Sequence, residues 1–112
     1  MIIKRPKTGW RVERVTAHPG MVLREDFLVP MGISANHLAL RTRMPATRMG
    51  EILHERHGIS TDTALRLARY FGTSAEFWLN LQAAHDLSRS RLELERTIER
   101  DVKPLKLEAV GA

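Results

Sequence analysis

The segment His37–Gly58, which reads HLALRTRMPATRMGEILHERHG, contains two short amphipathic patterns with a proline between them. In the first pattern, Leu38 and Ala39 face inward from one helix. In the second, Met49 and Ile52 belong to an apolar stripe at the spacing of another helix. Two short helices joined by a tight turn are typical of a helix-turn-helix unit. The segment therefore predicts such a unit, with the proline near the start of its second helix.

The turn between the two helices meets most requirements of a helix-turn-helix and departs from one. Ala39 is the small residue needed where the helices cross. Four residues later a left-handed residue, usually glycine, is expected, and Arg43 occupies that position. A residue with a side chain costs about 1 kcal/mol in that conformation. Either the turn has another shape, or a phosphate contact of Arg43 offsets the strain. The apolar wedge between the helices is predicted to consist of Leu38, Met44, Met49 and Ile52.

The open side of the second helix is predicted to contact DNA, because a helix-turn-helix places this helix in the major groove. Arg48 and Thr47 suit contacts with base edges. Glu51 suits either a cytosine amino group or a role in setting register, since a carboxylate also repels phosphate. The full set of residues on this side is Ala46, Thr47, Arg48, Gly50, Glu51 and His54.

Three further arginines are predicted to contact phosphates, which give affinity without sequence specificity. They are Arg41, Arg43 and Arg56. The chain carries a net charge of +5, from 18 basic and 13 acidic residues. A basic balance fits a nucleic-acid partner. The alternative for each arginine is an ordinary solvated position on the surface.

A longer amphipathic helix is predicted before this unit. It begins near Pro19, which suits a first helical position because its missing N–H is not needed there. Pro30 and Gly32 are predicted to end it. Ser34 then caps the first helix of the helix-turn-helix. The apolar face of the longer helix consists of Val22, Leu23, Phe27 and Leu28.

A fourth helix is predicted after the unit and a fifth follows it. Ser60 or Thr61 caps the fourth helix, and Gly72 is its left-handed stop. Thr73 and Glu76 form the capping box that starts the fifth. The buried side of the fourth helix is predicted to consist of Ala64, Leu65, Leu67, Ala68 and Phe71.

No glycine or proline interrupts the chain from Ser74 to Lys103, so the fifth helix is either one long rod or broken near Ser88–Ser90. Because Phe77 and Trp78 are consecutive, only one of them is expected in the core. The second half of the helix is highly charged and keeps one thin apolar stripe, Leu87, Leu94 and Ile98. Such a helix usually lies against a partner helix or a second subunit. The alternative is a solvated tail.

Several other classes of function find no support in the sequence. The 112-residue chain has no cysteine, which excludes disulfides and cysteine-bound metal. His54 and His57 do not have the spacing of a helical zinc pair, and no nucleophile stands beside a base. No apolar run approaches the roughly 18 residues that span a bilayer. We therefore expect a cytoplasmic, single-domain protein that is not an enzyme and binds no metal, cofactor or membrane.

Three stretches of the chain resemble a known family: HPGMVLREDFLVPMGIS, PATRMGEIL and GISTDTALRLARYFGTSAEFWLNLQAAHDL. They are similar to the HigA-type (VapI-like) antitoxins, within the lambda-repressor-like or XRE class of helix-turn-helix proteins. The resemblance implies a homodimer that binds double-stranded operator DNA and represses its own operon. It also implies a partner, a HigB or RelE-like ribonuclease toxin, which the protein neutralises. The alternatives are a helix-turn-helix regulator without a toxin and an interaction module that reads no DNA.

The chain departs from the family pattern at three places. Arg43 replaces the usual turn glycine, Gly50 replaces a common serine, and His54 with Glu55 replaces a common Asn-Gly pair. Gly50 offers DNA no hydroxyl and weakens its helix by about 1 kcal/mol relative to alanine. These changes bear on operator sequence and affinity rather than on the fold.

The expected architecture is an all-α, five-helix, lambda-repressor-like helix-turn-helix domain with a long C-terminal helix. The resemblance spans about two thirds of the chain, from His18 to Leu87. The predicted divisions are a basic N-terminal leader at 1–17, the helix-turn-helix domain at 18–87, a helical extension at 88–103 and a flexible tail at 104–112.

Overall fold

The computed structural model describes residues 15–106, and within this range the chain is helical with no strand. The predictions for the leader before residue 15 and for the tail after residue 106 lie outside the described residues. The first three elements follow one another without a break, so the described part has five helices, as predicted. The elements are α1 (Pro19–Val22), η1 (Leu23–Leu28), α2 (Val29–Met31), α3 (Ala35–Thr42), α4 (Ala46–Leu53), α5 (Thr61–Phe71) and α6 (Ala75–Asp101).

The first helix contains a wider π-helical turn, η1, between α1 and α2. The N–H of Val29 donates to the carbonyl of Arg24, five residues back instead of four. Pro30 follows directly, and its ring would clash with the carbonyl four residues earlier in a regular α-helix. The wider turn relieves that clash. The prediction that Pro30 helps to end the helix is therefore wrong, and Gly32 ends it alone, with φ of 64°.

Serine side chains cap three of the helices. Ser34 and Ser60 accept hydrogen bonds from the first turns of α3 and α5, as predicted, and Ser60 rather than Thr61 takes the position. Gly72 ends α5 in the left-handed conformation, with φ of 75°. The predicted capping box at Thr73 is wrong, because Ser74 caps α6 by accepting from the Phe77 N–H at 3.0 Å.

Thr73 instead accepts a hydrogen bond at 2.8 Å from the indole N–H of Trp78, which is fully buried. Phe77 is exposed, so one of the two consecutive aromatics lies in the core, as predicted. Leu65 is 58% exposed, and its predicted burial is wrong. The core is formed by Leu23, Leu28, Leu38, Ala39, Met44, Met49, Ile52, Leu53, Ile59, Ala64, Leu67 and Trp78.

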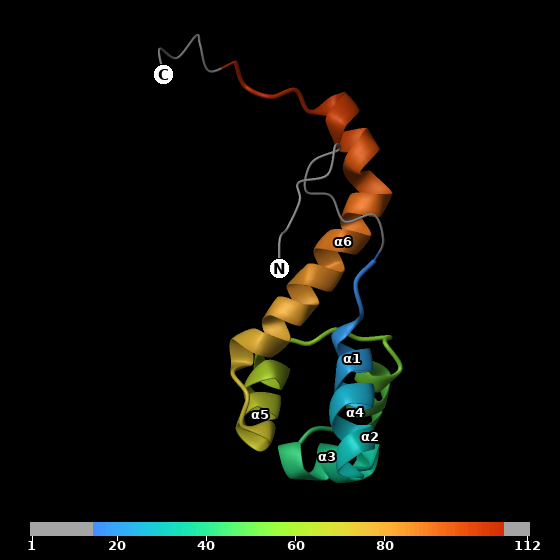
Figure 1. Cartoon of the computed structure of the whole chain (residues 1–112), viewed down its shortest axis with the longest axis vertical. Coiled ribbons are helices and arrows are strands. Elements are labelled where there is room, and N and C mark those ends of the chain that lie inside the picture. The colour runs from blue at the N-terminus through green and yellow to red at the C-terminus, as the bar shows by residue number, and fades with distance from the viewer. Residues whose placement is uncertain (1–14, 107–112) are drawn as a thin grey trace, which may run out of the picture.

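The helix α6 is a single rod of 27 residues. Figure 1 shows that its first turns pack on the other helices, and that the rest extends far beyond them. Ser88, inside this rod, is buried, and its hydroxyl accepts from the Thr16 N–H at 3.0 Å. His85 donates from Nδ1 to the Thr16 carbonyl at 2.7 Å. None of the helices in the described range is long and apolar enough to cross a membrane.

The buried His18 caps the first helix, and this role requires its neutral form. Its Nδ1 atom accepts a hydrogen bond from the Gly20 N–H at 2.9 Å. Burial lowers the pKa of His18 below its ordinary value of 6.5, and the nearby His85 ring lowers it further. Glu55 and Asp86 act in the opposite direction and only partly offset these effects. A protonated His18 can no longer accept the hydrogen bond from the Gly20 N–H, and its charge is buried next to the His85 ring.

Stability is therefore expected to fall as the pH drops below about 6.5, where the unfolded chain binds a proton at this position and the folded chain resists it. Urea unfolding at pH 8 and pH 5 measures the effect. His18→Asn keeps a capping acceptor and should flatten this dependence, whereas His37→Asn, at an exposed position, should leave it unchanged. Equal pH slopes in the two variants would rule out His18 as the cause.

Candidate nucleic-acid interface

The helices α3 and α4 meet as a helix-turn-helix. Ala39 is 2% exposed and lies at their crossing. The predicted wedge between them is confirmed, because all four of its residues are buried. They are Leu38, Met44, Met49 and Ile52. This packing fixes the angle at which α4 projects from the rest of the molecule.

The turn adopts the left-handed form at Arg43, with φ of 57° and ψ of 42°. The Met44 N–H donates to the Ala39 carbonyl at 2.9 Å, and the Arg43 N–H donates to the Leu40 carbonyl at 3.2 Å. This pair of bonds defines a Schellman motif, which requires a left-handed residue at its centre. The sequence left two shapes open, and the structure has the one that strains Arg43.

Arg66 of α5 supports this turn from outside, a role that the sequence did not reveal. Its Nη1 atom donates to the carbonyls of Thr42 at 3.0 Å and Arg43 at 3.4 Å. Its Nε atom pairs with Asp62 at 3.0 Å. The i, i+4 spacing of Asp62 and Arg66 signals the ion pair. Nothing in the spacing points to the turn, which is 24 residues away in the chain.

The open side of α4 presents polar side chains that have no partner in residues 15–106. Thr47, Arg48 and Glu51 are exposed, and their side chains form no hydrogen bond or ion pair with any other described residue. Ala46 is also exposed, at the first position of the helix. Pro45 precedes it and provides no side-chain cap, so the first amide N–H groups of α4 are not covered by a capping side chain.

The remaining predicted residues of this surface lie at the other end of α4. His54 follows the helix, and its Nδ1 atom donates to the Gly50 carbonyl at 2.8 Å. Its ring is therefore turned back along the helix. Gly50 is half-buried, and nothing lies near the place where its Cβ would stand. Arg56 is exposed in the loop that follows.

Two of the predicted phosphate contacts are separated by the structure. Arg43 lies in the turn next to the start of α4. Arg41 instead lines a groove between α3 and α5, and no residue of α4 contributes to that groove. Arg41 follows Ala39 by two residues, which turns it by about 200° around the helix. Since Ala39 faces α4, Arg41 faces away from it.

The part of the chain that the structure describes contains no group of three or more histidine or acidic residues arranged to hold a metal ion. His54 and His57 each bond to a nearby backbone carbonyl, Gly50 and Gly58 respectively. Both rings are thus held by local contacts.

Comparison with known proteins places this architecture among antitoxins. Virulence-associated protein I of Dichelobacter nodosus is 52% identical over 75 residues, 67% of this chain and 69% of that relative. Antitoxin HigA-1 of Vibrio cholerae serotype O1 is 34% identical over 98 residues, 85% of this chain and 89% of that relative. The structure of Pseudomonas aeruginosa antitoxin HigA with the higBA promoter matches with a TM-score of 0.78 and 41% identity, over 80% of this chain and 98% of that one. No family model matches the chain.

Proposed function

This chain belongs to the HigA family of helix-turn-helix antitoxins, and from that premise we propose that it binds operator DNA as a dimer and represses its own operon in the cytoplasm. The observation that carries the proposal is the open side of α4. Its exposed Thr47, Arg48 and Glu51 side chains have no partner among the described residues. A buried wedge holds this helix rigidly on α3. A rigid helix with unpaired polar groups suits the major groove.

Within this proposal, the ends of α4 have different tasks. Thr47 and Arg48 lie in its first turn, where a recognition helix meets the base edges. Arg43 in the turn and Arg56 in the following loop suit phosphates on either side. Glu51 lies one turn further along and discriminates by accepting from a base or repelling a phosphate. His54 is hydrogen-bonded to the Gly50 carbonyl of its own helix, and within this proposal it contacts DNA from the C-terminal end of α4.

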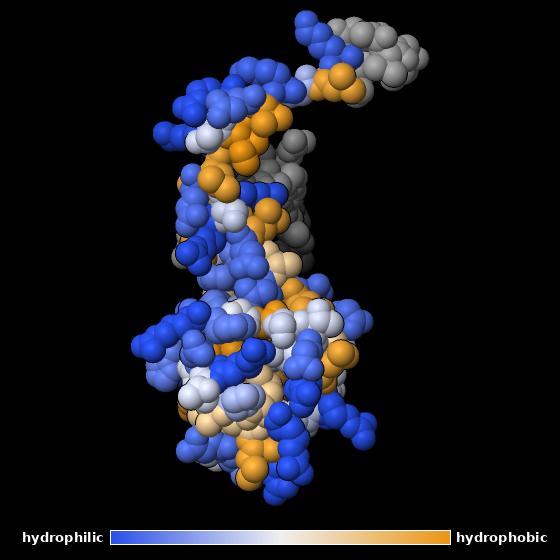
Figure 2. All heavy atoms as spheres, turned by 180° about the vertical axis from the view of Figure 1, so that it is seen from behind, coloured by the Kyte–Doolittle hydropathy of each residue, from blue (hydrophilic) through white to orange (hydrophobic). Residues whose placement is uncertain are grey.

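Dimer formation is supported by the apolar stripe of α6. Leu87, Leu94 and Ile98 are each about half exposed, at 52%, 48% and 51%. With Arg91 they line a shallow groove of about 240 Å³ along the rod. Figure 2 shows apolar surface along α6 beyond the packed helices. A second copy of α6 would cover this stripe and place two copies of α4 on one palindrome, since operator symmetry mirrors dimer symmetry.

Arg48→Ala is expected to weaken operator binding by about 1–3 kcal/mol and to relax specificity at one position in each half-site. The reason is that an arginine contact with guanine discriminates against other bases. Gel shifts with the upstream DNA and with base-substituted versions measure both effects. Arg96→Ala on α6 is the matched control. An equal loss on random DNA would reduce Arg48 to a phosphate contact, and no shift by the wild type would remove the autorepressor proposal.

We also propose a RelE-like ribonuclease toxin as a partner, which family membership supports. Where a small basic reading frame lies beside this gene, its co-expression with this chain is expected to yield a complex that co-purifies and restores growth. If the two proteins do not associate, the toxin half of the proposal fails. Gel shifts test the DNA-binding half separately, and their result does not depend on the toxin experiment.

A further inference from the structure

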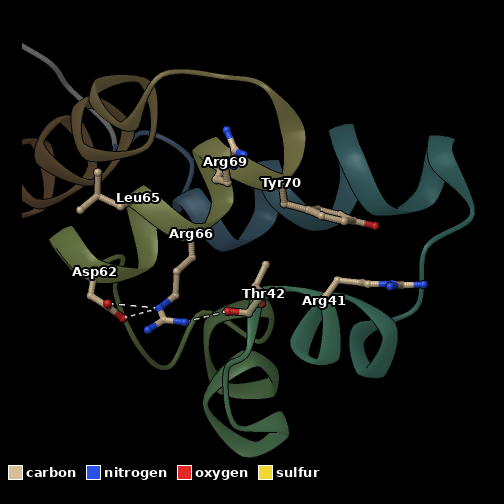
Figure 3. Close-up of a pocket in the computed structure, with 7 residues that line it drawn as sticks. All are labelled: Arg41, Thr42, Asp62, Leu65, Arg66, Arg69 and Tyr70. Carbon is tan, nitrogen blue, oxygen red and sulfur yellow. Dashed lines mark hydrogen bonds and ion pairs between the residues drawn. The ribbon is translucent and has the colours of Figure 1, made fainter.

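A groove lies between α3 and α5, and no residue of α4 lines it. Its volume is about 480 Å³, which is within the range of sites that bind small groups. Figure 3 shows its walls, with Arg41 and Thr42 on α3 facing α5. The α5 residues that line it are Asp62, Leu65, Arg66, Arg69 and Tyr70.

The groove is positively charged, and the charge is not balanced within it. Arg66 is neutralised by Asp62 and bonded to the Thr42 carbonyl, so this pair forms a fixed wall (Figure 3). Arg41 and Arg69 pair with no carboxylate in residues 15–106. Arg41 and Arg69 thus add two positive charges to the lining of the groove without a counter-charge, at separate places along it. Guanidinium groups bind carboxylates through two parallel hydrogen bonds.

The groove also has apolar walls, which bear on the kind of partner. Leu65 is exposed beside it, and the ring of Tyr70 stands edge-on to Phe71 with centroids 5.0 Å apart. In Figure 3 the Tyr70 and Arg41 side chains extend in the same direction. Leu65 and the Tyr70 ring carry no charge that could neutralise a DNA phosphate. Tyrosine and arginine together are instead typical of the residues that dominate protein–protein interfaces.

We propose that this groove binds a segment of a partner protein in which a carboxylate side chain lies next to an apolar one. Arg41 and Arg69, whose side chains project in different directions in Figure 3, turn toward the carboxylate when it binds, and the Tyr70 ring beside Arg41 covers the apolar neighbour. Arg41 points away from α4, so α4 does not cover this site. This site is independent of the operator-binding function proposed above.

The test is an array of hexapeptides with two acidic and two apolar residues in every arrangement, each paired with a copy in which glutamine or asparagine replaces the acids. Peptides that bind are then labelled and their affinities for the full chain are measured by fluorescence anisotropy. We expect acid-dependent binding that falls about tenfold or more in Arg41→Glu and in Arg69→Glu. Arg96→Glu, an exposed arginine on α6, is the matched control and should bind like the wild type.

Each other outcome contradicts the proposal. If no peptide depends on its acidic residues, the groove has no carboxylate site. If Arg96→Glu loses as much affinity as Arg69→Glu, the effect is general charge. If operator duplex displaces the peptide, or Arg69→Glu weakens operator binding more than Arg96→Glu does, the groove binds phosphate instead. Thermal unfolding of each variant separates loss of binding from loss of folding.

Discussion

Gly20→Ala is expected to lower the free energy of unfolding by about 3 kcal/mol or more, which is large for the addition of one methyl group. A Cβ atom at this position would overlap the backbone carbonyl oxygen of Ile52, where α1 crosses α4. It would also stand 3.0 Å from the Nδ1 atom of His18. Because the Ile52 carbonyl belongs to a helix, the two helices must separate, and α4 loses its fixed position.

The matched control is Gly50→Ala on α4, where nothing lies within 4 Å of the added Cβ. This change should raise stability by about 1 kcal/mol, the ordinary helix preference of alanine over glycine. Urea unfolding of the wild type and both variants measures the difference. If Gly20→Ala is as stable as the wild type, α1 and α4 do not cross as closely as the structure shows.

Replacing Leu94 and Ile98 together by glutamate is expected to convert the proposed dimer into monomers. Full burial of such an apolar side chain contributes about 1.5–3 kcal/mol, and because these two are already half-buried, an interface adds about half of that at each of the four positions of a symmetric dimer. Their loss weakens dimerisation by a factor of about 100 or more. Glutamate keeps the helix, because it is a good helix former. Operator affinity should fall with dimerisation, since both half-sites are then bound separately.

Leu92→Glu is the control for this pair. Leu92 is also exposed, at 52%, but does not line the groove along the stripe. Sedimentation equilibrium at several concentrations gives the dimer affinity of each variant. An unchanged dimer in the double variant would remove the α6 stripe from the interface, and an equal loss in Leu92→Glu would show that any added charge on this rod disrupts it.

Much of the fold could be predicted because local patterns encode it. Capping serines, a left-handed glycine and apolar spacing mark the helices, and Ser34, Gly72 and Met49 all have the predicted places. The predictions were wrong where a contact with the rest of the structure, or a change of helix type, outweighed the local sequence preference. Thr73 resembles a cap, but its hydroxyl accepts a hydrogen bond from the indole N–H of the buried Trp78. Pro30 resembles a stop, but the π-helical turn accommodates it within the helix.

The candidate site divides in the same way. Its helix α4 and the position of the turn were predicted, because residue spacing alone defines them, whereas the left-handed shape of the turn at Arg43 was left open. Arg66 was missed, because its contact with the turn crosses 24 residues. Gly20 gave no signal, because its close neighbour, the Ile52 carbonyl, lies on another helix. The roles of Arg48, Thr47 and the other predicted DNA contacts remain predictions that the gel shifts decide.

By itself, the sequence determined most of the apolar side of each helix, the helix boundaries at Ser34 and Gly72, and which family the chain resembles. Only the tertiary structure decided what lies against each side. Leu65 is apolar yet exposed, since it sits about 100° around α5 from the buried Ala64. Arg41 belongs to the same short helix as Ala39 and yet faces α5. Periodicity encodes directions around one helix axis, whereas the identity of the neighbour depends on how separate axes cross, which no local pattern contains.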